Sequence, residues 1–148
     1  MSRILIDTNV ILYTYDYRDN VRKSRAADVL RILEENKYGV FSVQTLSEFM
    51  SVVTKGTTTI IECSELLNQL QYWIRLFPVL PLTQNIVFEA TRCVKDHKLS
   101  YYDAQIWATA KLNQIPVIFS EDFQDGQTLE GVRFVNPFSE NFDVFQWS

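Results

Sequence analysis

The segment RILIDTNVILY, residues 3–13, carries the strongest fold signal in the chain. A short apolar run ends at Asp7, the polar residues Thr8 and Asn9 follow, and apolar residues resume at Val10. An apolar run bounded by polar turn formers is typical of a buried parallel strand, with Thr8 or Asn9 capping the helix that follows. Asp7 would then lie at the carboxyl end of the first strand, where open α/β sheets bind their ligands. Taken alone, an aspartate that only caps a helix is the simpler explanation of Asp7.

Composition and length indicate one globular domain over residues 1–148, because 47% of the residues are hydrophobic and 22% are charged. No apolar stretch reaches the roughly 18 residues of a membrane span, and the N-terminus has no signal-peptide pattern. We therefore expect a cytoplasmic protein with no membrane partner. Cys63 and Cys93 are too few for a disulfide framework or a zinc site, so we expect both to be reduced residues of the core.

The net charge of −4 is unusual for a protein that binds nucleic acid, since phosphate contacts normally require a basic surface. A nucleic-acid partner would need a local reversal of sign. Divalent cations on clustered carboxylates, or a basic protein partner, would provide it.

The remaining chain alternates helical and extended patterns, which predicts an α/β fold. We expect Gly39 to end one of the helices and residues 79–80 to form a short edge strand. The helix expected at 60–77 is more apolar than one helix of a small domain requires, so it either faces a second copy or partner or belongs to an ordinary core. The other expected helices are 9–15, 21–37, 44–54, 83–98 and 100–113, and the other expected strands are 40–43, 116–119 and 132–135.

Four acidic residues occur where this architecture would place a site: Asp7, Glu48, Asp103 and Asp122. Each has an ordinary explanation, and Asp103 fits the capping box SxxD that begins at Ser100. One shared role is a better explanation than four coincidences. Carboxylate-rich pockets with few histidines select hard cations, and phosphodiester hydrolysis is the chemistry that requires such a cluster. The single histidine, His97, is explained by its place in the last turn of a helix.

Five segments together resemble the PIN domain family, and most closely its VapC-like toxins of VapBC toxin-antitoxin pairs. They are IDTNVIL at 6–12, TLSEF at 45–49, YYDAQIWATA at 101–110, SEDFQDG at 120–126 and VNPF at 135–138. The resemblance implies a Rossmann-like three-layer α/β/α sandwich with a central, mostly parallel sheet of about five strands. It also implies an Mg²⁺- or Mn²⁺-dependent ribonuclease that leaves a 5′-phosphate and a 3′-hydroxyl, a homodimer, and a possible cognate antitoxin.

The resemblance also assigns the site. Asp7 and Asp103 match the principal metal ligands, Asp122 a ligand of a second or weaker metal, and Glu48 a ligand or a holder of the attacking water. The supporting positions are Thr8, Asn9 and Ser120. Glu121 and Asp125 are competing carboxylates beside Asp122, which is preferred because it keeps the hydroxyl-x-acid spacing from Ser120.

Two alternatives remain open. A phosphoaspartyl protein of the receiver or haloacid-dehalogenase type also places an aspartate after its first strand, but a dehalogenase requires a second aspartate where this chain has Asn9. A PIN-like protein that binds RNA or an antitoxin without cutting is the other alternative, and the presence of all four acids argues against it.

Overall fold

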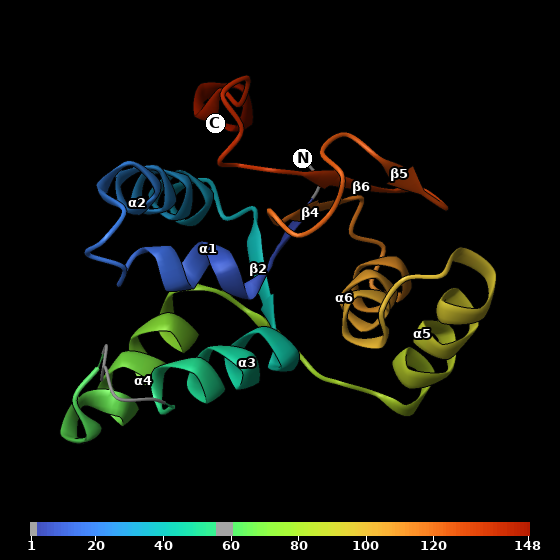
Figure 1. The fold of residues 1–148 in the computed structure, drawn as a ribbon, viewed down its shortest axis with the longest axis horizontal. Coiled ribbons are helices and arrows are strands. Elements are labelled where there is room, and N and C mark those ends of the chain that lie inside the picture. The colour runs from blue at the N-terminus through green and yellow to red at the C-terminus, as the bar shows by residue number, and fades with distance from the viewer. Residues whose placement is uncertain (1–2, 56–60) are drawn as a thin grey trace.

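A six-stranded sheet forms the centre of the computed structural model, which describes residues 3–55 and 61–148 (Figure 1). The strands lie in the order β3-β2-β1-β4-β6-β5, and every pairing is parallel except that of β5 with β6. Their bounds are β1 Ile4–Ile6, β2 Gly39–Ser42, β3 Val79–Leu80, β4 Val117–Phe119, β5 Thr128–Leu129 and β6 Val132–Val135. The mostly parallel sheet confirms the expected fold, including the edge strand at 79–80, while β5 was not expected.

Helices cover both faces of the sheet. In Figure 1, α1 to α4 form one group and α5 and α6 lie on the other side of the strands. Their bounds are α1 Thr8–Tyr13, α2 Asn20–Glu35, α3 Val43–Val53, α4 Leu66–Leu76, α5 Gln84–His97 and α6 Tyr101–Leu112, with short 3-10 helices at Cys63–Glu65 and Val144–Trp147.

The sheet separates two hydrophobic cores because successive strand residues point to opposite faces. Ile4 and Ile6 of β1 pack with α1 to α4, whereas Leu5 packs with α5 and α6. The same alternation continues in β4, where Phe119 faces the first core and Ile118 the second. This arrangement is a three-layer sandwich, as expected, and it buries the central strands on both faces.

Gly39 does not end a helix, which corrects the expectation from sequence. Helix α2 ends at Glu35, and Lys37 is the residue that adopts the left-handed conformation after it, with φ of 59°. Gly39 instead begins β2, where an added Cβ would lie 2.6 Å from the Phe77 ring and 2.9 Å from Ile6 Cδ1. The glycine is therefore required by close packing between the strand and the Phe77 ring.

The expectation of one helix over 60–77 was also wrong in its bounds. Helix α4 begins only at Leu66 and ends at Leu76, after the 3-10 turn Cys63–Glu65, and residue 60 lies outside the described part of the chain. Cys93 is buried as predicted, but Cys63 is exposed. Strong apolar periodicity indicated that a helix exists here without locating its first turn.

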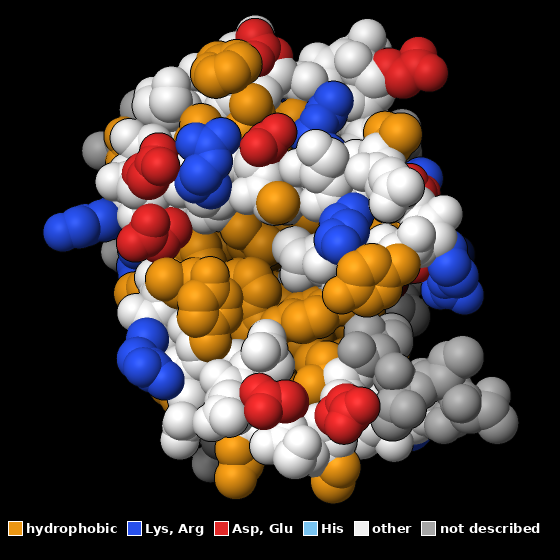
Figure 2. All heavy atoms as spheres, turned by 90° about the vertical axis from the view of Figure 1, so that its left-hand side faces the viewer, with side chains coloured by type: hydrophobic (Ala, Val, Ile, Leu, Met, Phe, Trp, Pro, Cys, Tyr) orange, Lys and Arg blue, Asp and Glu red, His pale blue; other side chains and the backbone are white. Residues whose placement is uncertain are grey.

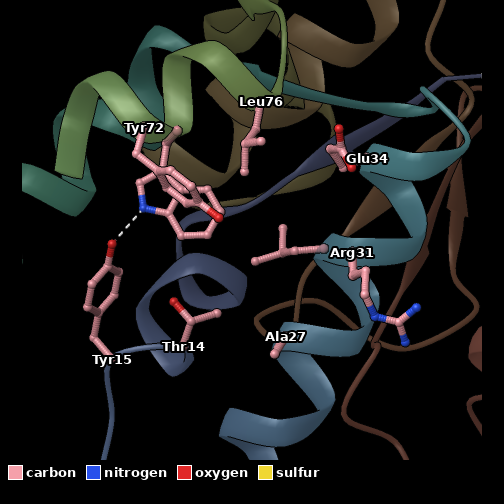
Figure 3. Close-up of a pocket in the computed structure, with 9 residues that line it drawn as sticks. Thr14, Tyr15, Ala27, Arg31, Glu34, Tyr72 and Leu76 are labelled. Carbon is pink, nitrogen blue, oxygen red and sulfur yellow. Dashed lines mark hydrogen bonds between the residues drawn. The ribbon is translucent and has the colours of Figure 1, made fainter. Parts of the chain in front are cut away.

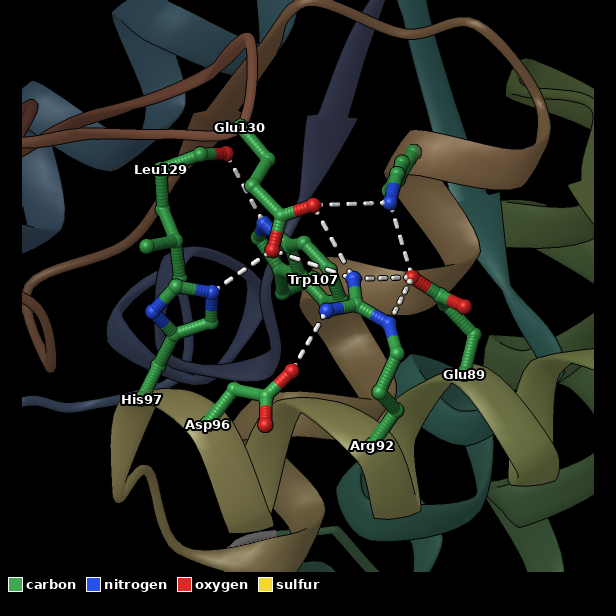
Figure 4. Close-up of polar contacts among 8 residues, drawn as sticks. Glu89, Arg92, Asp96, His97, Trp107, Leu129 and Glu130 are labelled. Carbon is green, nitrogen blue, oxygen red and sulfur yellow. Dashed lines mark hydrogen bonds and ion pairs between the residues drawn. The ribbon is translucent and has the colours of Figure 1, made fainter.

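A cluster of ion pairs connects the turn between β5 and β6 to α5 and α6 (Figure 4). Glu130 in this turn lies 3.0 Å from both Arg92 and Lys111, and its Oε2 lies 2.6 Å from His97 Nε2. The hydrogen bond with His97 and the two cations lower the pKa of Glu130 to about 2. Beneath the cluster, buried Trp107 donates its Nε1 hydrogen to a carbonyl oxygen of β5 at 3.0 Å. The cluster explains His97 as a structural residue.

The C-terminal segment packs back onto the domain. The rings of Phe142 and Trp147 contact Phe119 of β4 edge-on, with centroids 5.6 and 4.9 Å away. Among residues 3–55 and 61–148, no helix is long and apolar enough to span a membrane.

Candidate active site

Asp7 lies at the point where the strand order reverses. From β1 the chain continues to β2 and β3 on one side, while β4 and β6 lie on the other, so the carboxyl ends of β1 and β4 flank a topological switch point. Asp7 directly follows β1 and is 4% exposed. Its Oδ1 accepts the Thr8 N–H at 2.8 Å, so Asp7 itself is the N-cap of α1, which corrects the expectation that Thr8 or Asn9 caps this helix.

The cap uses only one oxygen of Asp7. The other, Oδ2, accepts a hydrogen bond of 2.7 Å from Ser120 Oγ, and buried Ser120 directly follows β4. Capping and a position in the site are therefore compatible for this aspartate. Asn9 joins the same group from the first turn of α1, because its Nδ2 lies 3.3 Å from Ser120 Oγ and 3.2 Å from Asp122 Oδ2. The amide of Asp122 also donates to Ser120 Oγ at 3.1 Å.

Glu48 reaches the pocket from α3 and is held by hydrogen bonds on both carboxylate oxygens. Thr8 Oγ1 donates to Oε2 at 3.0 Å, and Gln44 Nε2 donates to Oε1 at 2.8 Å. Gln105 of α6 in turn donates to Gln44 Oε1 at 2.8 Å. The two glutamines are buried, and the chain Gln105–Gln44–Glu48 ties α6 to α3.

Sequence reasoning missed both glutamines. A signal was present, because Gln105 interrupts an otherwise apolar stretch of its helix, and Gln44 and Glu48 have the i, i+4 spacing that places side chains on one helical face. Buried amides of this kind require hydrogen-bond partners, so they mark a polar network in the core.

Asp103 approaches from the first turn of α6. Ser100 is the N-cap of that helix but makes no side-chain capping bond, so the expected capping box is not formed. Within residues 3–55 and 61–148, no donor bonds the half-buried Asp103 carboxylate. Its charge contributes to raising the pKa of Asp122, which places the two carboxylates in the same neighbourhood.

Burial and mutual repulsion shape the electrostatics of this pocket. Burial raises the pKa of Asp7 to about 7, and the charges of Asp122 and Glu48 add to the rise against the bonds from Ser120 and Thr8. The pKa of Asp122 is also raised, first by partial loss of water contact and then by Asp103, Glu121 and Glu48. Asp122 therefore interacts electrostatically with Asp7, Glu48 and Asp103, although the four carboxylates come from four separate segments.

The competing acids have other partners. Asp125 Oδ1 accepts the Asn136 amide at 2.8 Å, which fastens the loop after β4 to the end of β6. Glu121 is bonded by the hydroxyl of Tyr13 and lies 3.3 Å from Arg22 Nε. Asp122 is the acid of this loop that Asn9 and Ser120 connect to Asp7.

The donor atoms suit a divalent cation. Asn9 Oδ1 is buried and has no hydrogen-bond partner among the residues that the structure describes, and the pocket otherwise offers carboxylate oxygens. Hard cations such as Mg²⁺ and Mn²⁺ take such oxygen ligands and retain several waters. As they lie, no three His, Cys, Asp or Glu side chains of residues 3–55 and 61–148 form a group that could hold a metal ion. The carboxylates are therefore neighbours without forming a finished coordination shell.

A second feature is an apolar groove between α1, α2 and α4 with a volume of about 450 Å³. Figure 2 shows this groove as a hollow that is lined by hydrophobic side chains and bordered by charged ones. Tyr72 and Leu76 of α4 face Ala27 of α2 across it, and Trp73 Nε1 donates to the Tyr15 hydroxyl at 2.7 Å (Figure 3). The remaining lining residues are Thr14, Leu30, Arg31 and Glu34.

Comparisons with solved structures find similar folds that cover about nine-tenths of this chain. FitAcB from Neisseria gonorrhoeae has a TM-score of 0.67 at 24% identity, covering 91% of this chain and 98% of its own. A toxin-antitoxin complex from Klebsiella pneumoniae has a TM-score of 0.64 at 20% identity, covering 90% and 97%. VapC20 from Mycobacterium tuberculosis, described as a toxin that cleaves the sarcin-ricin loop, has a TM-score of 0.63 at 19% identity, covering 88% and 98%.

The sequence itself carries the family assignment. A search of curated proteins finds no match. A family profile described as the PIN domain matches residues 4–124, which contain the four acidic positions and the strands β1 to β4. The profile spans most of the 148 residues, and the chain belongs to the PIN domain family.

Proposed function

We propose that this protein is a metal-dependent endoribonuclease and the toxin half of a toxin-antitoxin pair. The observation that carries the proposal is the carboxylate cluster at the β1–β4 switch point, where the charges of Glu48 and Asp122 act on buried Asp7. A pocket of carboxylates with no histidine is suited to hard cations rather than to proton transfer by imidazole. The similar folds include a toxin-antitoxin complex and a toxin, which supports the same interpretation.

The roles that we propose for the acids are those that the resemblance to PIN domains implies. Asp7 and Asp103 would be the principal ligands of Mg²⁺ or Mn²⁺, and Asp122 would hold a second or more weakly bound ion. When bound, the cation supplies an activated water and neutralises charge that develops on the phosphate oxygens. Glu48, with one oxygen fixed by Thr8 and the other by Gln44, would ligate the ion or orient the attacking water.

Supporting residues keep the acids in place. Ser120 donates to Asp7 and accepts the Asp122 amide, so one hydroxyl connects the residue that follows β1 to the loop that follows β4. Such contacts orient metal-binding carboxylates. In-line attack of water on phosphorus breaks the bond to the 3′ oxygen, so the products are a 5′-phosphate and a 3′-hydroxyl.

The substrate that we expect is single-stranded or looped RNA, because unstacked bases can be splayed out for recognition, whereas a duplex hides them. The description of VapC20 as a toxin that cleaves the sarcin-ricin loop supports this substrate class.

The direct test is cleavage of a labelled RNA hairpin by purified protein in millimolar Mn²⁺ and in chelator. We expect cutting within the loop only with the metal, and products that carry a 5′-phosphate. RNA that is bound but left intact in Mn²⁺ would favour the alternative, a PIN-like protein that binds RNA or an antitoxin without nuclease activity.

The cognate antitoxin is the proposed occupant of the groove between α1, α2 and α4. Tyr72 lines the groove and is 50% exposed, so an apolar surface remains open beside the buried Trp73. A contiguous exposed apolar surface rimmed by charges is typical of a protein-binding site. Structures similar to this chain include a toxin-antitoxin complex, so an apolar segment of an antitoxin is the occupant that we propose.

Tyr72→Arg should weaken binding of the protein encoded next to this gene by roughly tenfold or more, since aromatic anchors dominate interface energies. Leu67→Arg is the matched control, because Leu67 is on the same helix, is 72% exposed and does not line the groove. Titration calorimetry on both variants provides the comparison. Equal affinities of the two variants would contradict this location.

The homodimer stays a prediction, and light scattering at tens of micromolar protein would test it.

A further inference from the structure

A clasp of three side chains lies on the rim of the acidic pocket. The Tyr13 hydroxyl donates to Glu121 Oε1, and Arg22 Nε lies 3.3 Å from Glu121 Oε2. The Arg22 guanidinium also lies over the Tyr13 ring, 5.5 Å from its centroid. These side chains come from α1, from α2 and from the loop after β4, so the contacts are tertiary rather than local.

The clasp is adjacent to the proposed chemistry. Glu121 is followed by Asp122, whose amide donates to Ser120 Oγ and whose carboxylate accepts from Asn9. Glu121 therefore connects the cation Arg22 to the loop that carries Asp122. Its own carboxylate is already bonded on both oxygens, which makes it a poor candidate for the metal-ligand role that the sequence left open.

RNA must overcome repulsion to reach a pocket of carboxylates in a chain with net charge −4. A cation at the rim would reduce this repulsion. The Arg22 side chain is 44% exposed, and its planar fork of donors matches a phosphate group. Arg22 also forms an ion pair with Asp19, the N-cap of α2, at 3.0 Å. This contact keeps the arginine at the rim when its ion pair with Glu121 is broken.

Lys23, which follows Arg22 in the chain, adds a second cation to this side of the site. Lys23 Nζ lies 3.9 Å from the centroid of the Tyr17 ring, and Tyr17 is 75% exposed. Within residues 3–55 and 61–148, no carboxylate forms an ion pair with Lys23. Exposed aromatic rings beside cations are typical of surfaces that bind single-stranded nucleic acid.

We propose that Arg22 binds a backbone phosphate of the RNA and that Glu121 is a gate carboxylate, which holds Arg22 when RNA is absent and is displaced by the phosphate. The proposal rests on the proposed function in one respect, namely that the substrate is RNA. It makes Arg22 a substrate-positioning residue and removes Glu121 from the metal-binding set.

Two substitutions should change RNA affinity in opposite directions. Arg22→Ala removes the phosphate contact, so the Kd for RNA should rise roughly tenfold, and the slope of log Kd against log salt should fall by about one. Glu121→Gln keeps the shape of the side chain but removes the charge that competes with phosphate, so the Kd should fall several-fold. In the double variant, the gain from Glu121→Gln should disappear because it acts through Arg22.

The experiment measures anisotropy of a labelled single-stranded RNA of mixed sequence in chelator, at several salt concentrations. Each variant is made in an Asp103→Asn background, which prevents cleavage. Arg22→Lys, which retains the charge without the fork, should bind with an intermediate Kd. Arg75→Ala is the matched control on α4, where the arginine contacts only the carbonyl of Gln71 among described hydrogen bonds. Thermal melts of every variant show that the proteins compared are folded.

Three results would overturn the proposal. They are equal Kd values for Arg22→Ala and Arg75→Ala, a gain from Glu121→Gln that persists without Arg22, and no detectable RNA binding at all. The proposed function fails on a different measurement, which is the absence of Mn²⁺-dependent cleavage by the wild-type protein. RNA binding that depends on Arg22 without any cleavage would support this inference and overturn the nuclease.

Discussion

Asp7→Asn and Asp103→Asn should each lower the rate of Mn²⁺-dependent RNA cleavage by roughly a hundredfold or more, since losing even an outer partner of a metal ligand costs about 10- to 100-fold. Asp7→Asn retains the shape of the side chain and an oxygen that can cap α1, but it removes the charge that would bind the cation. Asp103→Asn removes a carboxylate that makes no hydrogen bond in the described part of the chain, so its effect would not come from a lost contact. Initial rates on a labelled RNA hairpin measure both effects.

Asp125→Asn and His97→Ala are the controls for that experiment. Asp125 is in the same loop as Asp122, but its carboxylate accepts the Asn136 amide, and His97 is bonded to Glu130. Both variants should cleave at close to the wild-type rate. Loss of cleavage in His97→Ala together with normal cleavage in Asp7→Asn would contradict the carboxylate mechanism.

Asp7→Asn should melt above the wild-type protein in chelator and gain little from metal, whereas the wild type should gain strongly. A metal that binds only the folded state contributes RT ln(1 + [L]/Kd), about 2.7 kcal/mol at a hundredfold excess over Kd. For a domain of this size, 1 kcal/mol shifts the melting temperature by about 2–4 °C. Asp103→Asn should behave in the same way, with a smaller rise in chelator because Asp103 is only half-buried.

The free energy of unfolding of the wild type in chelator depends on pH with a definite sign. Burial raises the folded-state pKa of Asp7 from 3.8 to about 7, so the folded protein binds more protons than the unfolded chain between these values. In chelator, wild-type stability should therefore fall as pH rises from about 4 to about 7, by an amount on the order of 2 kcal/mol. Asp7→Asn should lack this decline.

Thermal melts in chelator and in millimolar Mn²⁺, at pH 5 and pH 8, compare the wild type with Asp7→Asn, Asp103→Asn and the control Asp125→Asn. Because asparagine retains a capping oxygen, a purely structural Asp7 predicts that Asp7→Asn melts no higher than the wild type in chelator and gains as much from Mn²⁺. Variants that melt below the wild type in chelator and rise as much as the wild type with Mn²⁺ would exclude a shared metal site.

The sequence predicted the fold well where patterns are local. The apolar runs at β1, β4 and β6 correspond to the strands in the structure, and the PIN family assignment is confirmed. The strand β5 was missed because a pair of residues at a sheet edge has too little periodicity to detect. The roles of Asp7, Glu48, Asp103 and Asp122 stay predictions, although the structure places them in one neighbourhood.

The cap of α1 illustrates the limit of reading residues in isolation. From sequence, a capping Asp7 and a catalytic Asp7 were competing explanations, but the carboxylate has two oxygens and the structure uses them separately, one for Thr8 and one for Ser120. The capping box at Ser100 failed for a related reason, since a motif of matching residue types does not ensure that the side chains turn toward the helix amides.

The sequence by itself determined the alternation of strands and helices and the family, and it predicted which acidic residues form the site, because these depend on residue types and on spacing along the chain. Only the tertiary structure decided that Glu121 pairs with Arg22 and Asp125 with Asn136, which leaves Asp122 beside Asn9. It also decided that Gln105 and Gln44 hold Glu48, and that Gly39 is needed beside Phe77. These contacts join residues far apart in sequence, and their partners depend on how the helices pack across the sheet, which local patterns do not encode.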